Sequence, residues 1–330
     1  MRSPKPLVEI VSTGRWLPDR VLTNADLEKM VDTDDQWIVE RTGIRERRIA
    51  PCTIGAGEMG AGASRVAMDR AGVHPGEIDL IVTATATPDR LLPATACDIQ
   101  ARLGASHAAA FDISAACSGF IYALSIAEGY LAAGRGDIAL VVSTEKMSGI
   151  IDWDDRATCV LFGDGAGAAI VRRSTNGRGI LSSFIRSDGT LAQLLWRPAG
   201  GVLEPMTEER LAAKDHLLRM AGREVFKAAV RSMAEASDQA LARAGLTGDD
   251  IDLFIPHQAN LRIIEATARY ASVPMEKVYV NVDRYGNMSS ATIPIALDEA
   301  IEQGRIKPGA NVLMVAFGAG FTWASSVVRW

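Results

Sequence analysis

The chain has 330 residues, 48% of them hydrophobic, which is enough to bury a large core in two domains or two fused halves. Its 35 basic and 40 acidic residues give a formal net charge of −5, which argues against general nucleic-acid binding. No apolar stretch is long enough to span a bilayer, and the four cysteines show neither a C-x-x-C pair nor metal-like spacing. We therefore expect a cytoplasmic protein with reduced cysteines, no membrane insertion and no metal.

An aromatic and basic segment comes early in the chain. Trp37 is followed by four arginines within residues 41–48, and Gly43 breaks any helix there. Such a run of charge is usually a solvated loop. An aromatic ring beside several guanidinium groups also suits a nucleotide, because arginine pairs with phosphate and stacks on rings. The segment alone does not decide between these two interpretations.

A helix followed by a strand occurs twice in the sequence. We expect an alanine-rich helix over residues 60–71 and a strand over 77–88, and eight of their residues recur 173 positions later. Chance similarity of two amphipathic units would be the alternative, but we predict a duplicated α/β domain with halves 1–175 and 176–330. The matched pairs are Ser64 and Ser237, Ala67 and Ala240, Arg70 and Arg243, Ala71 and Ala244, Gly72 and Gly245, Ile78 and Ile251, Asp79 and Asp252, and Leu80 and Leu253.

The segment 111–134 contains a cysteine, Cys117, where an almost wholly apolar helix should begin, with Glu128 as the only charge in the run 120–133. A helix that is apolar on nearly every side is normally buried. At its first turn a thiol faces free backbone N–H groups and the positive end of the helix dipole, which favour thiolate. Cys117 is therefore a candidate nucleophile, although a lone cysteine is more often a small buried hydrophobic residue.

Two segments in which hydrophobic residues show no regular spacing follow. The glycines of the segment 162–167 resemble a nucleotide-binding loop, but a β-like run follows them instead of a helix, so we interpret them as a tight turn. Residues 188–213 form a long irregular stretch with glycine, proline and Trp196. A loop of that length in a compact domain is often a lid or a binding loop.

Candidate partners of the cysteine lie in the second half. His257 comes directly after the expected strand IDLFIP, and strand ends are where sites form in open α/β sheets. Asn287 lies just before another helix, whose Ser290 is 173 positions after Cys117. If the halves are related by a pseudo-twofold axis, both helix starts meet and bring Cys117, His257 and Asn287 together. Near the C-terminus, small residues around Ala319 would let a backbone N–H approach a substrate oxygen, and the alternative is that they only form a tight hairpin.

Five segments together resemble β-ketoacyl-acyl carrier protein synthase III of the thiolase superfamily, over essentially the whole chain. They are TNADLEKMVDTDDQWIVERTGIRERRIA, DISAACSGF, HQANLRII, YGNMSSATIPIAL and FGAGFTW. The resemblance implies a five-layer αβαβα fold of two duplicated halves and a homodimer. It also implies an acyltransferase of fatty acid biosynthesis that takes a short acyl group from acyl-CoA and condenses it with malonyl-acyl carrier protein, without a cofactor.

The resemblance also assigns roles to residues. Cys117, His257 and Asn287 would be catalytic, and the amides of Cys117 and Ala319 would form the oxyanion hole. Arg262, helped by Lys227 and Arg269, would meet the acidic carrier protein. Leu92 stands where members selective for acetyl groups often have a bulky phenylalanine, so the resemblance implies tolerance of longer or branched acyl groups. The residues that would contact CoA or substrate are Trp37, Arg41, Arg156, Phe226, Asn260 and Leu92.

Other protein classes fit less well. A degradative thiolase would need a second cysteine near the C-terminus, and none follows Cys159. A cysteine hydrolase could use the same three residue types, but the duplicated architecture and the basic, aromatic segment do not favour it. A non-catalytic protein on this fold would be expected to lack one of the three. The nearest alternative is a related acyltransferase or condensing enzyme of specialised metabolism.

Overall fold

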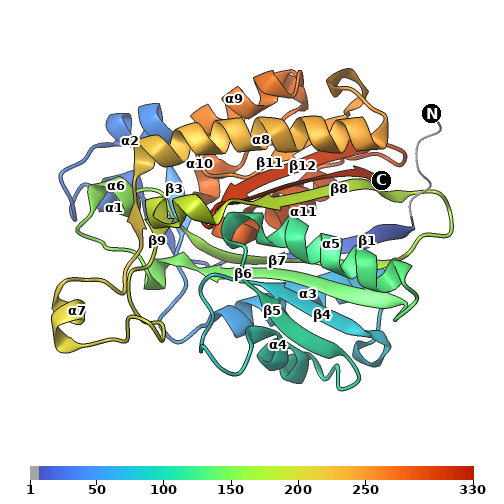
Figure 1. Ribbon diagram of the computed structural model, residues 1–330, viewed down its shortest axis with the longest axis horizontal. Helices are drawn as coiled ribbons and strands as arrows, with labels where there is room; N and C mark the ends of the chain where they lie inside the picture. Colours follow the sequence, from blue (N-terminus) through green and yellow to red (C-terminus); the bar gives the residue numbers. More distant parts are fainter. Residues whose placement is uncertain (1–6) are drawn as a thin grey trace.

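In a computed structural model, which describes residues 7–330, two β-sheets lie at the centre of the molecule (Figure 1). The first six residues of the predicted N-terminal half lie outside the described residues. The first sheet has the strand order β1-β7-β6-β4-β5, in which β4 runs parallel to β5 and β6 and the other pairs are antiparallel. Its strands are β1 (Val8–Trp16), β4 (Leu80–Ala84), β5 (Ala109–Ile113), β6 (Ile138–Lys146) and β7 (Asp164–Arg173).

The second sheet repeats this order with one strand fewer. Its order is β11-β12-β13-β8, with β11 and β12 parallel and the remaining pairs antiparallel. The position 173 residues after β5 holds a short helix, α10 (Val282–Tyr285), so the fifth strand is replaced there. The strands are β8 (Gly179–Ser187), β11 (Leu253–Pro256), β12 (Asn311–Gly318) and β13 (Thr322–Arg329).

Helices cover both sheets and also separate them, which gives five layers in the order αβαβα (Figure 1). The apolar helix α5 (Gly119–Ala132) and α11 (Thr292–Glu302) lie between the sheets. The predicted five-layer fold of duplicated halves is therefore confirmed. The outer layers are α3 (Ala56–Ala71) with α4 (Thr95–Leu103) on the first sheet, and α8 (Gly222–Ala244) with α9 (Leu261–Tyr270) on the second.

The repeat of 173 residues extends to details of the backbone. Helices α3 and α8 both end at a left-handed glycine, Gly72 and Gly245. The 3-10 turns η2 (Ala116–Ser118) and η7 (Ser289–Ala291) precede the two central helices at the same spacing. Each turn begins with a non-glycine residue at positive φ, 44° for Ala116 and 48° for Ser289. A conformation that costs such residues on the order of 1 kcal/mol thus occurs in both halves, at the start of both central helices.

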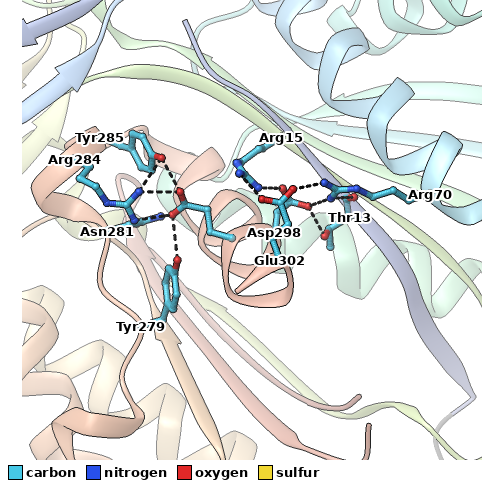
Figure 2. A network of polar contacts seen from close by, with 10 residues as sticks. Thr13, Arg15, Arg70, Tyr279, Asn281, Arg284, Tyr285, Asp298 and Glu302 are labelled. Carbon is cyan, nitrogen blue, oxygen red and sulfur yellow. Dashed lines mark hydrogen bonds and ion pairs between the residues drawn. The ribbon is translucent and has the colours of Figure 1, made fainter. Parts of the chain in front are cut away.

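Two polar networks fix the far end of α11 (Figure 2). The buried carboxylate of Asp298 accepts hydrogen bonds from Thr13, Arg15 and Arg70 on the first half. On the neighbouring face of the helix, Glu299 accepts hydrogen bonds from four side chains of its own half. Buried charges are stable only when they are paired and hydrogen-bonded in this way. The four donors to Glu299 are Tyr279, Asn281, Arg284 and Tyr285.

The remaining helices and strands are short. The irregular stretch expected over 188–213 contains a 3-10 helix, η4 (Gly189–Leu194), and α7 projects from the body of the molecule (Figure 1). These elements are β2 (Val21–Thr23), α1 (Asn24–Leu27), α2 (Asp35–Thr42), β3 (Glu46–Arg48), α6 (Arg156–Cys159), β9 (Leu195–Trp196), α7 (Glu208–Ala212) and β10 (Arg219–Met220).

Candidate active site

Cys117 lies in the 3-10 turn η2, directly before α5 and between the two halves. Two hydrogen bonds tie this turn to the hairpin of β12 and β13. Ser118 Oγ donates to the Thr322 carbonyl at 3.0 Å, and Thr322 Oγ1 donates to the Ala115 carbonyl at 2.8 Å. The hairpin thereby holds Ala319 and its neighbours against the cysteine.

His257 continues from the end of β11, where its backbone N–H donates to the Val315 carbonyl at 2.8 Å. Its ring is buried, and Nδ1 lies 2.7 Å from Thr292 Oγ1. Asn287 is oriented by its own turn, because its side-chain Oδ1 accepts the backbone N–H of Ser289 at 2.8 Å. The amide nitrogen Nδ2 is then left to donate to a ligand.

Cys117, His257 and Asn287 line a single cavity of about 470 Å³, together with Ala319. Most of the other lining side chains are apolar, among them Met147, Ile150, Phe226, Met233 and Phe317. An apolar cavity with a few converging polar groups at one end is a common form of small-molecule site. The predicted meeting of the three side chains is thus present in the structure, while their catalytic roles stay a prediction.

Burial decides the protonation of the two ionisable groups. It raises the pKa of the Cys117 thiol to about 12, against a smaller lowering by the Ser289 hydroxyl, and nearby Glu145 raises the pKa further. Burial also lowers the pKa of His257 to about 3. At neutral pH both groups are therefore uncharged. Burial therefore opposes the thiolate that the start of the helix favours when it is considered alone.

Several of the predicted CoA-contacting residues cluster outside this cavity. The guanidinium carbon of Arg41 lies 4.4 Å from the centre of the Trp37 ring, and that of Arg156 lies 4.9 Å from it. Asn260 lines the cavity and donates to the Arg41 carbonyl at 2.8 Å, which joins the cluster to the rim of the cavity. Cationic groups stacked on an indole ring are suited to a nucleotide and its phosphates.

The residues predicted to meet a carrier protein lie on the outer helices. The guanidinium carbon of Arg262, at the start of α9, lies 5.7 Å from the ring centre of Phe226, which lines the cavity. Lys227 follows Phe226 on α8 and is exposed, and Arg269 is exposed two turns further along α9. Arg262 thus lies next to a residue that lines the cavity.

Leu92, a predicted substrate contact, does not lie in solvent-shielded surroundings in the single chain. It lies in the loop between β4 and α4, is 85% exposed and does not line the cavity of its own chain. Its neighbour Leu91 is 84% exposed. A contact of Leu92 with substrate would therefore need a second copy of the chain.

The structure adds residues that the sequence did not single out. Ser289 lines the cavity beside Cys117, and Thr292 contacts the ring of His257. Their only signal in the sequence is their place at the start of the second central helix. In the long stretch after residue 188, Trp196 and Arg197 line the cavity. Leu218 and Met220, further along the chain, line it as well.

The duplication creates a position equivalent to that of Cys117 at the start of the second central helix, and a carboxylate occupies it. Ser290 corresponds to Cys117 and Ala84 corresponds to His257, each at 173 residues. The Ser290 hydroxyl lies 2.8 Å from a carboxylate oxygen of Glu145, which is fully buried and also accepts hydrogen bonds from Thr87 and the Ala86 amide. A carboxylate therefore occupies the pseudo-symmetric helix start.

Residues 7–330 contain no group of three or more His, Cys, Asp or Glu side chains arranged to hold a metal ion. None of the helices within the same range is long and apolar enough to cross a membrane.

The fold and this site define a class: a thiolase-fold enzyme whose candidate nucleophile is a cysteine at the start of a buried central helix. The sequence model of 3-oxoacyl-acyl-carrier-protein (ACP) synthase III matches residues 111–189, and that of its C-terminal part matches residues 241–330. The chain belongs to the β-ketoacyl-acyl carrier protein synthase III family.

Relatives and solved structures agree along nearly the whole chain. A β-ketoacyl-acyl-carrier-protein synthase III of Caldanaerobacter subterraneus subsp. tengcongensis is 52% identical over 321 residues, which cover 97% of both chains. The crystal structure of the Aquifex aeolicus 3-oxoacyl-acyl-carrier-protein synthase III is 48% identical, with a TM-score of 0.91 over 98% of this chain and all of that one. The priming β-ketosynthase of the R1128 polyketide pathway is 38% identical, also with a TM-score of 0.91, over 100% of this chain and 98% of that one.

Proposed function

We propose that this chain is a condensing enzyme that begins fatty acid synthesis by joining a short acyl group from acyl-CoA to malonyl-acyl carrier protein. One observation carries the proposal: Cys117, His257 and Asn287 line the same apolar cavity. Such a cavity suits an acyl chain, and its polar end offers a nucleophile beside groups that can donate hydrogen bonds. Membership of the synthase III family supports this reaction over others on the same fold.

In the first half-reaction, the sulfur of Cys117 attacks the thioester carbonyl of acyl-CoA. The bond from that carbonyl to the CoA sulfur breaks, and the thiol proton leaves with CoA. Because burial keeps the resting thiol neutral, this proton must leave as the attack proceeds. The amides of Cys117 and Ala319 stabilise the oxyanion, and an acyl-enzyme remains.

In the second half-reaction, malonyl-acyl carrier protein replaces CoA. Its carboxylate leaves as CO2, and the electron pair forms an enolate whose oxygen accepts hydrogen bonds from His257 and Asn287. The enolate carbon attacks the acyl group, the bond to the Cys117 sulfur breaks, and the thiolate regains a proton from solvent. The product is a 3-oxoacyl-acyl carrier protein. These steps balance without a redox cofactor or a metal, and we propose that none is used.

The surroundings of the cavity support the two substrates. Trp37, Arg41 and Arg156 would hold the nucleotide of CoA, while Phe226 and Asn260 would line the pantetheine path. Arg262, with Lys227 and Arg269, would attract an acidic carrier protein. Local basic groups on a chain of net charge −5 would favour such a partner without general binding to nucleic acid.

A homodimer is part of the proposal, as is a cytoplasmic location. Strand β5 forms an edge of the first sheet, and its Phe111 is 39% exposed. An exposed edge with the neighbouring apolar side chains of Leu91 and Leu92 is suited to pairing with a second copy. That copy would receive Leu92 at the end of its acyl pocket. Light scattering that finds a monomer at micromolar concentration would contradict this arrangement.

A related condensing enzyme of specialised metabolism is the second candidate, because the R1128 priming β-ketosynthase matches this chain over its whole length. The two functions differ in the molecule that accepts the acyl group from the enzyme. Acyl-enzyme should be offered malonyl-acyl carrier protein from the same cell's fatty acid pathway, malonyl-CoA, and water alone. Rapid condensation with the carrier-bound malonyl group supports the proposed function, whereas discharge only to another acceptor or to water would refute it.

A further inference from the structure

Thr292 contacts the ring of His257 at its Nδ1 atom. It is the first residue of α11, it is fully buried, and its Oγ1 lies 2.7 Å from His257 Nδ1. Within residues 7–330 no carboxylate is hydrogen-bonded to this ring. In triads that use a histidine, a third group orients the ring and selects its tautomer. Here the group in that position is a hydroxyl.

The hydroxyl has one proton and two candidate acceptors. Thr292 Oγ1 lies 2.7 Å from His257 Nδ1 and 3.1 Å from the Ser289 carbonyl oxygen. Hydrogen bonds from a hydroxyl to oxygen are normally about 2.5–3.0 Å long, so the contact with Ser289 is long and the contact with Nδ1 is short. The shorter contact favours a proton on the bond with Nδ1, whereas a hydroxyl that donates to the Ser289 carbonyl would accept from Nδ1–H instead.

We propose that Thr292 is a positioning residue whose hydroxyl donates to Nδ1 of His257 and thereby fixes the neutral tautomer that carries its proton on Nε2. The inference rests on the proposed function and specifies how His257 performs its part of it. A neutral imidazole has one donor nitrogen and one acceptor nitrogen, so an accepted bond at Nδ1 leaves Nε2–H to donate. Burial supports a neutral ring, because it lowers the pKa of His257 to about 3.

The consequence is a pair of neutral donors at the polar end of the cavity. Asn287 presents Nδ2 because its Oδ1 accepts the Ser289 amide, and His257 presents Nε2–H because Nδ1 accepts the Thr292 hydroxyl. Both orientations are set before any substrate binds, by Ser289 of η7 and by Thr292 at the start of α11. Pre-oriented donors stabilise the enolate oxygen that forms when the malonyl carboxylate leaves. Attack by Cys117 on acyl-CoA does not need this tautomer, since the oxyanion there is held by backbone amides.

Two variants separate the hydroxyl from the shape of the side chain. Thr292→Val keeps the volume and removes the donor, and Thr292→Ser keeps the donor and removes a methyl group. Intact-protein mass gives the rate at which Cys117 becomes acylated. Rapid mixing of pre-acylated enzyme with malonyl-acyl carrier protein gives the rate of condensation. We expect Thr292→Val to lose roughly ten- to a hundredfold in condensation while acylation stays within about threefold, and Thr292→Ser to stay near wild type in both.

Nitrogen-15 NMR of histidine-labelled protein reads the tautomer directly, and the chain has four histidines to resolve. The His257 signals are assigned by their loss in His257→Asn. We expect protonated Nε2 and unprotonated Nδ1 in the wild type and in Thr292→Ser, and a mixture in Thr292→Val. A wild-type ring protonated on Nδ1, or a Thr292→Val variant that loses both half-reactions equally or neither, would overturn the inference. A wild type that shows the Nε2–H tautomer but forms no acyl-enzyme would instead contradict the proposed function.

Discussion

Replacing Gly318 by alanine should displace the amide of Cys117. A Cβ atom built on Gly318 would lie 2.6 Å from the backbone nitrogen of Cys117 and 3.1 Å from the Ala116 side chain. Ordinary contacts of a Cβ begin at 3.4 Å, so the strand and the turn would have to separate by roughly 0.8 Å. Gly318 is not among the glycines with positive φ, so its backbone tolerates alanine and only the lack of space opposes it.

The displaced group is the N–H proposed to hold the oxyanion. A shift of this size lengthens a hydrogen bond beyond its useful range, and loss of one such donor costs about 10²- to 10³-fold in kcat. Overpacking of this kind also destabilises a protein by about 1–3 kcal/mol. We therefore expect Gly318→Ala to stay folded, with a lower melting temperature, and to form acyl-enzyme at least about a hundredfold more slowly than wild type.

A matched control exists on the neighbouring helix. A Cβ on Gly129 of α5 would meet nothing within 4 Å, so Gly129→Ala should keep wild-type acylation and gain up to about 1 kcal/mol from helix propensity. Intact-protein mass measured at short times after mixing with acyl-CoA gives the rates, and thermal unfolding gives the stability. Gly318→Ala that acylates Cys117 at the wild-type rate while folded would refute the assignment of this amide.

Three further changes test other parts of the molecule. Burial would raise the pKa of Glu299, but hydrogen bonds led by Arg284 outweigh it and hold the pKa below its ordinary 4.5. Glu299→Gln should therefore cost about 2 kcal/mol at pH 7, and thermal unfolding at several pH values should show the difference shrinking below pH 4.5 as the wild type loses this contribution; a constant difference would contradict it. Arg262→Glu should raise KM for malonyl-acyl carrier protein about tenfold or more and leave acylation by acyl-CoA unchanged, and equal loss in both assays would argue against a carrier-protein contact. Leu92→Phe should reduce turnover of acyl groups longer than acetyl by roughly tenfold, measured with a panel of acyl-CoAs, and an unchanged panel would remove Leu92 from the acyl pocket.

The duplication was the part of the fold most accessible from sequence. Eight matched residues at one offset predicted two related halves, and the same offset relates the turns that begin both central helices. The replacement of the fifth strand by α10 was not predictable in this way, because an offset between matched residues says nothing about a segment where the match is lost. Layer order then places Cys117 and Asn287 together, since each precedes one of the two central helices.

The properties of the site that depend on burial were less accessible. The helix start at Cys117 favours a thiolate when considered alone, yet the surrounding layers remove water from the thiol and raise its pKa. The contact between Thr292 and His257 joins residues 35 positions apart, and no pattern along the chain indicates it. Leu92 is 85% exposed in the single chain, and its place in an acyl pocket rests on the proposed homodimer.

The most direct test of the central claim is intact-protein mass after incubation with a panel of acyl-CoAs, followed by addition of malonyl-acyl carrier protein, on the wild type and on Cys117→Ser. The account predicts an acyl adduct on the wild type that Cys117→Ser does not form. The adduct should then disappear as a carrier-bound 3-oxoacyl product appears. No adduct on the wild type would contradict the assignment of the nucleophile, and an adduct discharged only to water would contradict the condensing reaction.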